Sequence, residues 1–149
     1  MDLFWKGFLS GSGSGIMLNL WGFFIKNLLP VANRNYVDWT AVIISGVLPT
    51  TWYEFLYALI TNLIWCGFLG ILFAYLLPKL TSDRFLLKGA IYGFMIGFLI
   101  HGSAILLRMP FFTMIPFRTS SSLAFGGLLW GVLTAALLRW LERKDQSRM

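Results

Sequence analysis

The stretch KGFLSGSGSGIMLN, residues Lys6–Asn19, decides how the rest of the chain is interpreted. Alternating glycine and serine is typical of a flexible linker, yet this tract lies inside a long apolar segment. Glycines recur at every fourth position, at Gly7, Gly11 and Gly15, and the same spacing leads to Asn19. Residues four apart share one face of a helix, where glycines let a second helix approach closely in a membrane. The stretch therefore predicts a membrane helix with a packing face.

The composition is that of a membrane protein. Of the 149 residues, 58% are hydrophobic and 12% are charged, whereas about 25% of the residues in a soluble domain are charged. A spanning helix needs about 20 mainly apolar residues. Four segments meet this requirement: residues 7–25, 55–77, 89–107 and 121–138. The predicted fold is all-α, an integral membrane four-helix bundle that forms a single domain over residues 1–149.

The third apolar segment repeats the pattern of the first, 82 residues later. A lysine, three glycines and a polar residue recur at the same spacing: Lys88, Gly89, Gly93, Gly97 and His101. The second and fourth segments correspond at an offset of 61 residues, with Cys66, Gly70 and Ala74 matching Gly127, Gly131 and Ala135. We therefore expect two tandem helix hairpins, related by an axis along the membrane normal, that pack through these small residues.

Three polar side chains lie deep within the predicted spans. Asn19 and His101 are equivalent positions of the repeat, and Asn62 lies in the second span. Polar groups at such depth face the bundle interior and find a partner. We expect Asn19 and His101 to meet each other or a water molecule, with Asn62 in the same layer. The more specific hypotheses for His101 are a proton relay or a ligand of haem or chlorophyll. The sequence favours the simpler one, a neutral histidine satisfied by a hydrogen bond.

Positive charges predict the orientation of the bundle. Eight lysines and arginines would lie on the side of the two termini: Lys6, Lys79, Arg84, Lys88, Arg139, Arg143, Lys144 and Arg148. Four would lie on the opposite side: Lys26, Arg34, Arg108 and Arg118. Cytoplasmic loops carry the excess of lysine and arginine. We therefore expect a multi-pass protein of the plasma membrane with both termini in the cytoplasm, and a polar basic tail over residues 142–149.

The connection between the first two spans is long, at residues 31–52. It contains the apolar stretch Trp39–Leu48, which is too short to cross a membrane. One interpretation is a re-entrant or interfacial helix on the outer side. The favoured interpretation is a lid that packs on the bundle.

The chain shows no sign of an enzyme. No aspartate or glutamate lies well inside a predicted span, and the serine tract lacks the G-x-S-G motif of a rhomboid protease. A phosphate loop, a nucleotide fingerprint and a His/Cys metal cluster are also missing from the sequence. The single cysteine, Cys66, allows no internal disulfide. We expect no catalytic residues, no metal and no cofactor.

Three functional hypotheses follow. The first is a structural or partner-binding protein of the lipid bilayer, a homo-oligomer or a subunit of a larger membrane complex, because glycine and aromatic faces invite partners. The second is a small transporter or channel whose polar layer consists of Asn19, Asn62 and His101. The third is an RNA-associated membrane protein that contacts phosphates through its basic cytoplasmic face.

Three stretches carry a resemblance to known proteins: VDWTAVIISGVLPTTWYE (residues 37–54), GFLGILFAYLLPKL (67–80) and DRFLLKGAIYG (83–93). They resemble the small four-helix membrane proteins of Firmicutes, including the YqhR-like group. This resemblance covers most of the chain and implies four spans in a bundle, with no known activity. In size, span count and net charge the chain is also similar to a basic four-helix membrane protein of Firmicutes that binds a structured noncoding RNA. The acidic D-x-x-x-D pair of that family is replaced here by glycines and serines.

Overall fold

The computed structural model describes residues 2–29, 31–79 and 84–146. Its elements are, in chain order, α1 (Leu3–Asn27), α2 (Tyr36–Ser45), α3 (Trp52–Leu76), the short 3₁₀ helix η1 (Leu77–Lys79), α4 (Phe85–Leu106) and α5 (Phe117–Gln146). The described residues contain no strand, which confirms the all-α class.

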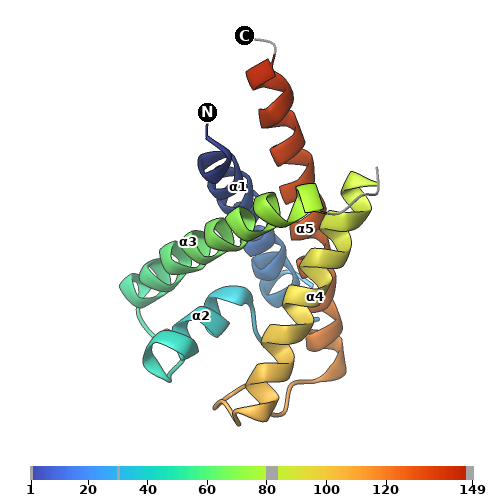
Figure 1. Ribbon diagram of the computed structural model, residues 1–149. Coiled ribbons are helices and arrows are strands. Elements are labelled where there is room, and N and C mark those ends of the chain that lie inside the picture. The colour runs from blue at the N-terminus through green and yellow to red at the C-terminus, as the bar shows by residue number, and fades with distance from the viewer. Residues whose placement is uncertain (1, 30, 80–83, 147–149) are drawn as a thin grey trace.

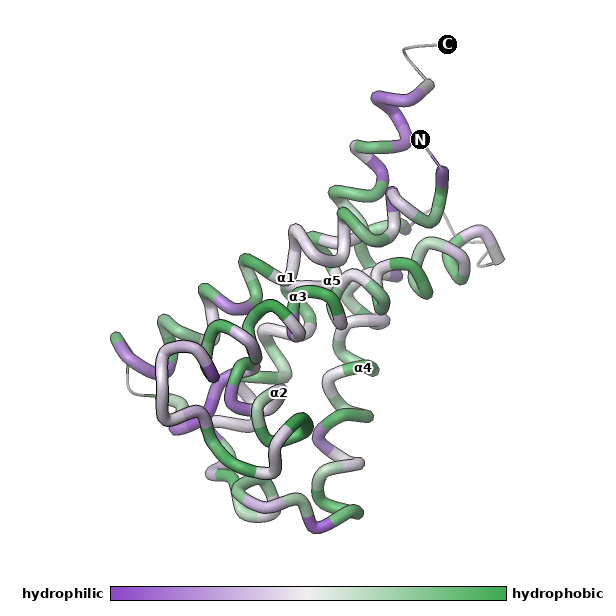
Figure 2. The backbone as a smooth tube through the Cα atoms, turned by 90° about the vertical axis from the view of Figure 1, so that its left-hand side faces the viewer, coloured by the Kyte–Doolittle hydropathy of each residue, from purple (hydrophilic) through white to green (hydrophobic). Residues whose placement is uncertain are grey.

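Four of the helices, α1, α3, α4 and α5, are long and apolar enough to cross a membrane. Large apolar side chains are exposed on their outer faces, among them Ile16, Phe23, Ile64, Phe68, Phe98 and Phe125. Such a surface would be costly in water but suits contact with lipid. Figure 2 shows hydrophobic residues along the long helices and hydrophilic residues gathered at the C-terminal end of α5. The structure is therefore consistent with a membrane protein.

The predicted polar tail at residues 142–149 begins inside α5. α5 continues through its described part and ends at Gln146, and residues 147–149 lie outside the described residues. Two basic residues, Arg143 and Lys144, occupy the last turn. Positive charge there interacts favourably with the negative end of the helix dipole, which helps to prolong the helix.

The long helices pack in the order α3, α1, α5 and α4, with α1 and α5 in the middle (Figure 1). Both termini lie at the same end of the bundle (Figure 1). The Nζ atom of Lys6 in α1 lies 2.8 Å from the Oδ2 atom of Asp145 in α5, so an ion pair joins the two ends.

Small residues hold α1 against α3. A Cβ atom added at Gly11 would collide with the carbonyl oxygen of Cys66 and lie 2.8 Å from the Cα atom of Gly70. At Gly7 it would lie 2.9 Å from the Gly70 carbonyl oxygen and 3.0 Å from the methyl group of Ala74. The two backbones therefore touch where only glycine fits.

Small residues also hold α4 against α5. A Cβ atom added at Gly93 would collide with the carbonyl oxygen of Gly127 and lie 2.9 Å from the Cα atom of Gly131. At Gly89 it would collide with the carbonyl oxygen of Gly131 and lie 2.6 Å from the methyl group of Ala135. Close approach of this kind is how helices associate in lipid.

Aromatic side chains join these two helix pairs by donating hydrogen bonds to backbone carbonyls. The Trp130 indole donates to Gly11 at 3.1 Å, and the Trp21 indole donates to Ser122 at 3.2 Å. Across α3 and α4, the Tyr92 hydroxyl donates to the carbonyl of Leu69 at 2.8 Å. Each bond satisfies a side-chain donor that lipid could not satisfy.

The connection at residues 31–52 contains α2, which begins three residues before the predicted apolar stretch Trp39–Leu48 and ends at Ser45. Asn35 and Asp38 form a capping box at its start, and Gly46 ends it with a φ of 75°. The Asp38 carboxylate also pairs with Lys26 of α1 at 2.7 Å. These contacts fix α2 on the bundle at the end opposite to the termini (Figure 1).

Candidate functional site

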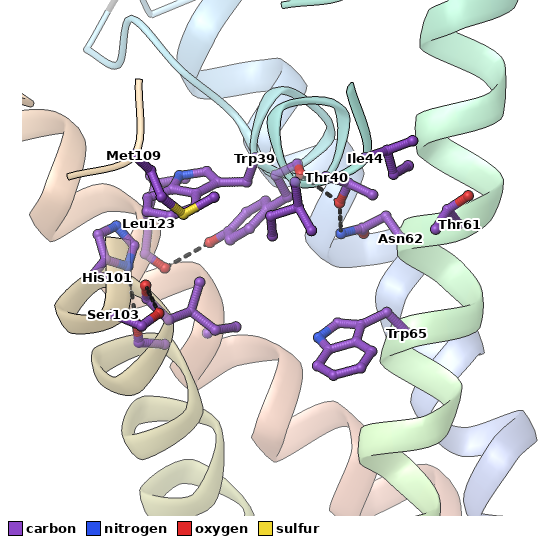
Figure 3. A pocket seen from close by; sticks show the side chains of 15 residues that line it. Trp39, Thr40, Ile44, Thr61, Asn62, Trp65, His101, Ser103, Met109 and Leu123 are labelled. Atoms are coloured by element: carbon purple, nitrogen blue, oxygen red, sulfur yellow. Dashed lines mark hydrogen bonds between the residues drawn. The ribbon is translucent and has the colours of Figure 1, made fainter. Parts of the chain in front are cut away.

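A cavity of about 340 Å³ lies between α2, α3, α4 and α5 (Figure 3). Its volume is at the lower end of the range of about 300–1,000 Å³ for ligand pockets. Its walls are mainly apolar, with Ile43 and Ile44 from α2, Trp65 from α3 and Ile100 from α4. The polar residues of the wall are Tyr36, Thr40, Thr61, Asn62, His101 and Ser103.

Because Gly97 has no side chain, the space beside it in the cavity stays open. Gly15 in α1 has the same spacing from its neighbouring glycines, and a Cβ atom there would lie 2.9 Å from the Cβ atom of Cys66. At Gly97, however, an added Cβ atom would meet nothing within 4 Å. The close packing of α4 on α5 at Gly93 therefore gives way, one turn later, to the cavity.

His101 lies on the wall one turn beyond Gly97, and its Nδ1 atom is 2.9 Å from the Gly97 carbonyl oxygen. Because a carbonyl only accepts, this hydrogen bond assigns the proton to Nδ1 and makes Nε2 the acceptor of the neutral ring. Nε2 is buried and has no hydrogen-bond partner among the described residues. The structure thus leaves one acceptor of His101 unused.

Trp39 of α2 faces His101, with 4.9 Å between the two ring centroids. Its indole also packs on Phe112, with 3.9 Å between the two ring centroids. The side chain is 5% exposed, and its Nε1 donor likewise has no partner among the described residues. An unused donor and an unused acceptor therefore belong to two adjacent rings of the cavity wall (Figure 3).

The other predicted polar residues form a separate chain of hydrogen bonds. The Asn19 amide donates to the Asn62 carbonyl oxygen at 2.8 Å, and the Asn62 amide donates to the Thr40 hydroxyl at 2.9 Å. Asn62 also lines the cavity, but Asn19 is not among the lining residues. These bonds tie α1, α3 and α2 together.

The expected meeting of Asn19 and His101 does not occur among the described contacts. Asn19 is bonded to Gly15 and Asn62, whereas His101 is bonded to Gly97 and packed on Trp39. The reason is the order of the helices, because α1 packs between α3 and α5 while α4 packs on the far side of α5.

The residues of α2 in the cavity were not predicted. Tyr36, Trp39 and Thr40 lie on one face of α2 and line the cavity. The Tyr36 hydroxyl donates to the Leu123 carbonyl at 2.6 Å, and burial raises the pKa of this hydroxyl. Gly126 provides the room, because a Cβ atom there would collide with the Tyr36 hydroxyl. The spacing 36, 39, 40 is the helical signal that could have identified this face.

The residues of the predicted cytoplasmic basic face that the structure describes lie at the end of the bundle that holds the termini. Arg139 stacks over the Phe85 ring at 5.5 Å and Lys144 over the Trp140 ring at 4.9 Å. At this end Lys79 closes η1, while Arg84 and Lys88 lie at the start of α4. Arg148 lies outside the described residues.

Comparison with family models, with curated proteins and with solved structures gives no significant match to this chain.

Proposed function

We propose that this chain is a non-enzymatic integral membrane protein that binds a small apolar molecule in the cavity between α2, α3, α4 and α5. The observation that carries the proposal is the cavity of about 340 Å³, whose wall is mainly apolar and includes Trp39 and His101, each of which has a buried polar atom without a partner. Ligand sites combine an apolar wall with a few polar groups that orient the ligand.

The finer architecture that we propose is an internal repeat of two helix hairpins, α1 with α3 and α4 with α5. Three observations support it. Gly11 meets Cys66 and Gly70 as Gly93 meets Gly127 and Gly131. Gly7 meets Gly70 and Ala74 as Gly89 meets Gly131 and Ala135. The side chains of Asn19 and His101 both bond to the glycine carbonyl four residues before them, at 2.8 and 2.9 Å.

The two hairpins differ at the cavity. In the first, Gly15 packs on Cys66, but in the second, the space beside Gly97 is open. The longer connection of the first hairpin supplies α2, which reaches over this space with Trp39 and Thr40. The proposed binding site is thus the place where the packing of the second hairpin differs from that of the first.

A substitution that fills the cavity tests the proposal. The side chain of Gly97→Leu would enter the cavity, whereas Gly102→Leu adds the same bulk to α4 at a glycine with open space around it that does not line the cavity. Bromodecanol would be added to the protein in lipid nanodiscs, because bromine quenches tryptophans that it contacts, and Trp39 and Trp65 line the cavity.

We expect saturable quenching in the wild type and in Gly102→Leu, and only the unsaturable background of lipid partitioning in Gly97→Leu. If Gly97→Leu shows the same saturable quenching as Gly102→Leu, the cavity is not the binding site. Circular dichroism of each variant would confirm that the helices are intact.

A further inference from the structure

The polar groups that face the cavity are almost all occupied by partners within the protein. The hydroxyls of Thr61 and Ser103 donate to backbone carbonyls one turn earlier in their own helices. The Asn62 amide donates to Thr40, and the Tyr36 hydroxyl donates to Leu123. The hydroxyl protons of Thr61, Ser103 and Tyr36 are therefore already donated within the protein.

Trp39 and His101 are the exceptions on the described wall of the cavity. Both Trp39 Nε1 and His101 Nε2 are buried without a hydrogen-bond partner, although buried polar groups are normally paired. The rings are adjacent, with 4.9 Å between their centroids. Neither can turn away easily, because Trp39 packs on Phe112 and His101 is held by the Gly97 carbonyl.

The two atoms have complementary requirements. An indole nitrogen only donates, and His101 Nε2 accepts because the proton is on Nδ1. One group satisfies both when it accepts from Trp39 and donates to His101. A hydroxyl group does so. An ether or ester oxygen accepts from Trp39 but cannot donate to His101, and a carboxylate also lacks a proton to donate.

The side chain that packs beside these two rings, Met109, is flexible. Met109 packs on the cluster that contains Trp39 and Phe112, and it also lines the cavity. A methionine side chain is unbranched and flexible, so it can adjust to make room for a small group next to the two rings. The labelled side chains in Figure 3 show Met109 beside Trp39 and His101 at one end of the cavity.

Resting on the proposed function, we propose that the ligand is an apolar molecule with a hydroxyl group, which accepts a hydrogen bond from Trp39 Nε1 and donates one to His101 Nε2. The apolar part of the ligand lies along the isoleucine and tryptophan side chains of the remaining wall. Selectivity for the alcohol over the matching hydrocarbon or acid is the property that distinguishes this proposal from simple apolar binding.

The test compares three probes of equal chain length: bromodecanol, bromodecane and bromodecanoate. The part of the tryptophan quenching that is lost in Gly97→Leu reports their binding in nanodiscs, since Trp39 and Trp65 line the cavity. We expect the dissociation constant of bromodecanol to be about tenfold lower than that of bromodecane, the gain of a buried hydrogen-bond pair. Equal constants, or tighter binding of bromodecanoate, would overturn the proposal.

Two variants separate hydrogen bonding from packing. Trp39→Phe keeps an aromatic ring against Phe112 but removes the donor, and His101→Leu removes the acceptor. The measured quantity is the ratio of the bromodecane and bromodecanol constants, since a loss of packing weakens both probes alike. We expect each variant to lower this ratio to about 3, because one of the two hydrogen bonds remains, and the double variant to lower it to about 1, while bromodecane still binds. An unchanged ratio in both variants would refute the role of these residues.

The result also separates this inference from the proposed function. If no probe gives saturable quenching, the proposed function itself is wrong. If all three bind equally, the cavity binds apolar molecules but the hydroxyl assignment is wrong. A brominated diacylglycerol identifies the source of the hydroxyl. Its binding would indicate a lipid headgroup, and binding of bromodecanol alone would indicate a free alcohol.

Discussion

Among single residues, Gly11 is one whose replacement we expect to be harmful. In Gly11→Ala the methyl group would meet backbone atoms of Cys66 and Gly70, which cannot rotate away, so α1 and α3 must separate. We expect the free energy of unfolding in detergent to fall by about 1–3 kcal/mol. Gly13→Ala is the control, because its methyl group would lie 3.5 Å from the Leu137 side chain, an ordinary contact. Equal destabilisation of the two variants would contradict this account.

The polar residues give a second prediction at this scale, tested by double-mutant cycles. Asn19→Ala and Asn62→Ala remove partners of one hydrogen bond, so we expect a coupling of about 0.6 kcal/mol, with an upper limit near 1.7 kcal/mol. Asn19→Ala and His101→Ala affect residues with different partners, so their effects should add. A large coupling energy between Asn19 and His101 would contradict this arrangement and support the single polar layer that the sequence predicts.

The polar residues also show what sequence can predict at this scale. The glycines at spacing four could be identified as packing residues because spacing alone decides which face they share. The hydrogen-bond partner of Asn19 could not be identified from the sequence, since it depends on which helix lies beside α1. The sequence pattern placed Asn19 and His101 at equivalent positions, but equivalent positions in two hairpins face their own neighbours.

Among the elements, α2 is the one whose stability we expect to control the cavity. Asp38 is the third residue of the helix and completes the capping box with Asn35, and it also pairs with Lys26, so Asp38→Ala should destabilise the helix by about 1 kcal/mol. We expect faster hydrogen–deuterium exchange over residues 36–45, with little change in α1 and α3. Lys26→Met removes the ion pair and keeps the capping box, so its effect should be smaller. Unchanged exchange in Asp38→Ala would show that the cap does not hold α2.

The long helices were predictable because length and hydropathy are local properties of the chain. The predicted span 7–25 lies within α1, and the predicted 121–138 lies within α5. The start of α2 was missed, although Asn35 and Asp38 have the spacing of a capping box. Its place over the cavity could not be predicted, because a short apolar helix has no length requirement that fixes its position.

For the whole molecule, the testable property is orientation in the membrane. Both ends of the chain meet at the Lys6–Asp145 ion pair, and the excess of lysine and arginine at this end predicts that it faces the cytoplasm. In a Cys66→Ala background, we expect Val47→Cys, which lies in the outer connection, to react with an impermeant maleimide on intact cells. Asp2→Cys should react only after permeabilisation. The reverse pattern would invert the proposed topology.

The hydrogen bonds between the helix pairs have a consequence for mutational tolerance. Their donors are side chains of Trp21, Tyr92 and Trp130, but their acceptors are backbone carbonyls, for example those of Ser122 and Leu69. Every residue type supplies the same carbonyl. A saturation scan should therefore find donor positions restricted to side chains that reach and donate, whereas Ser122 accepts many replacements. Variation can thus accumulate on one side of this contact without breaking it.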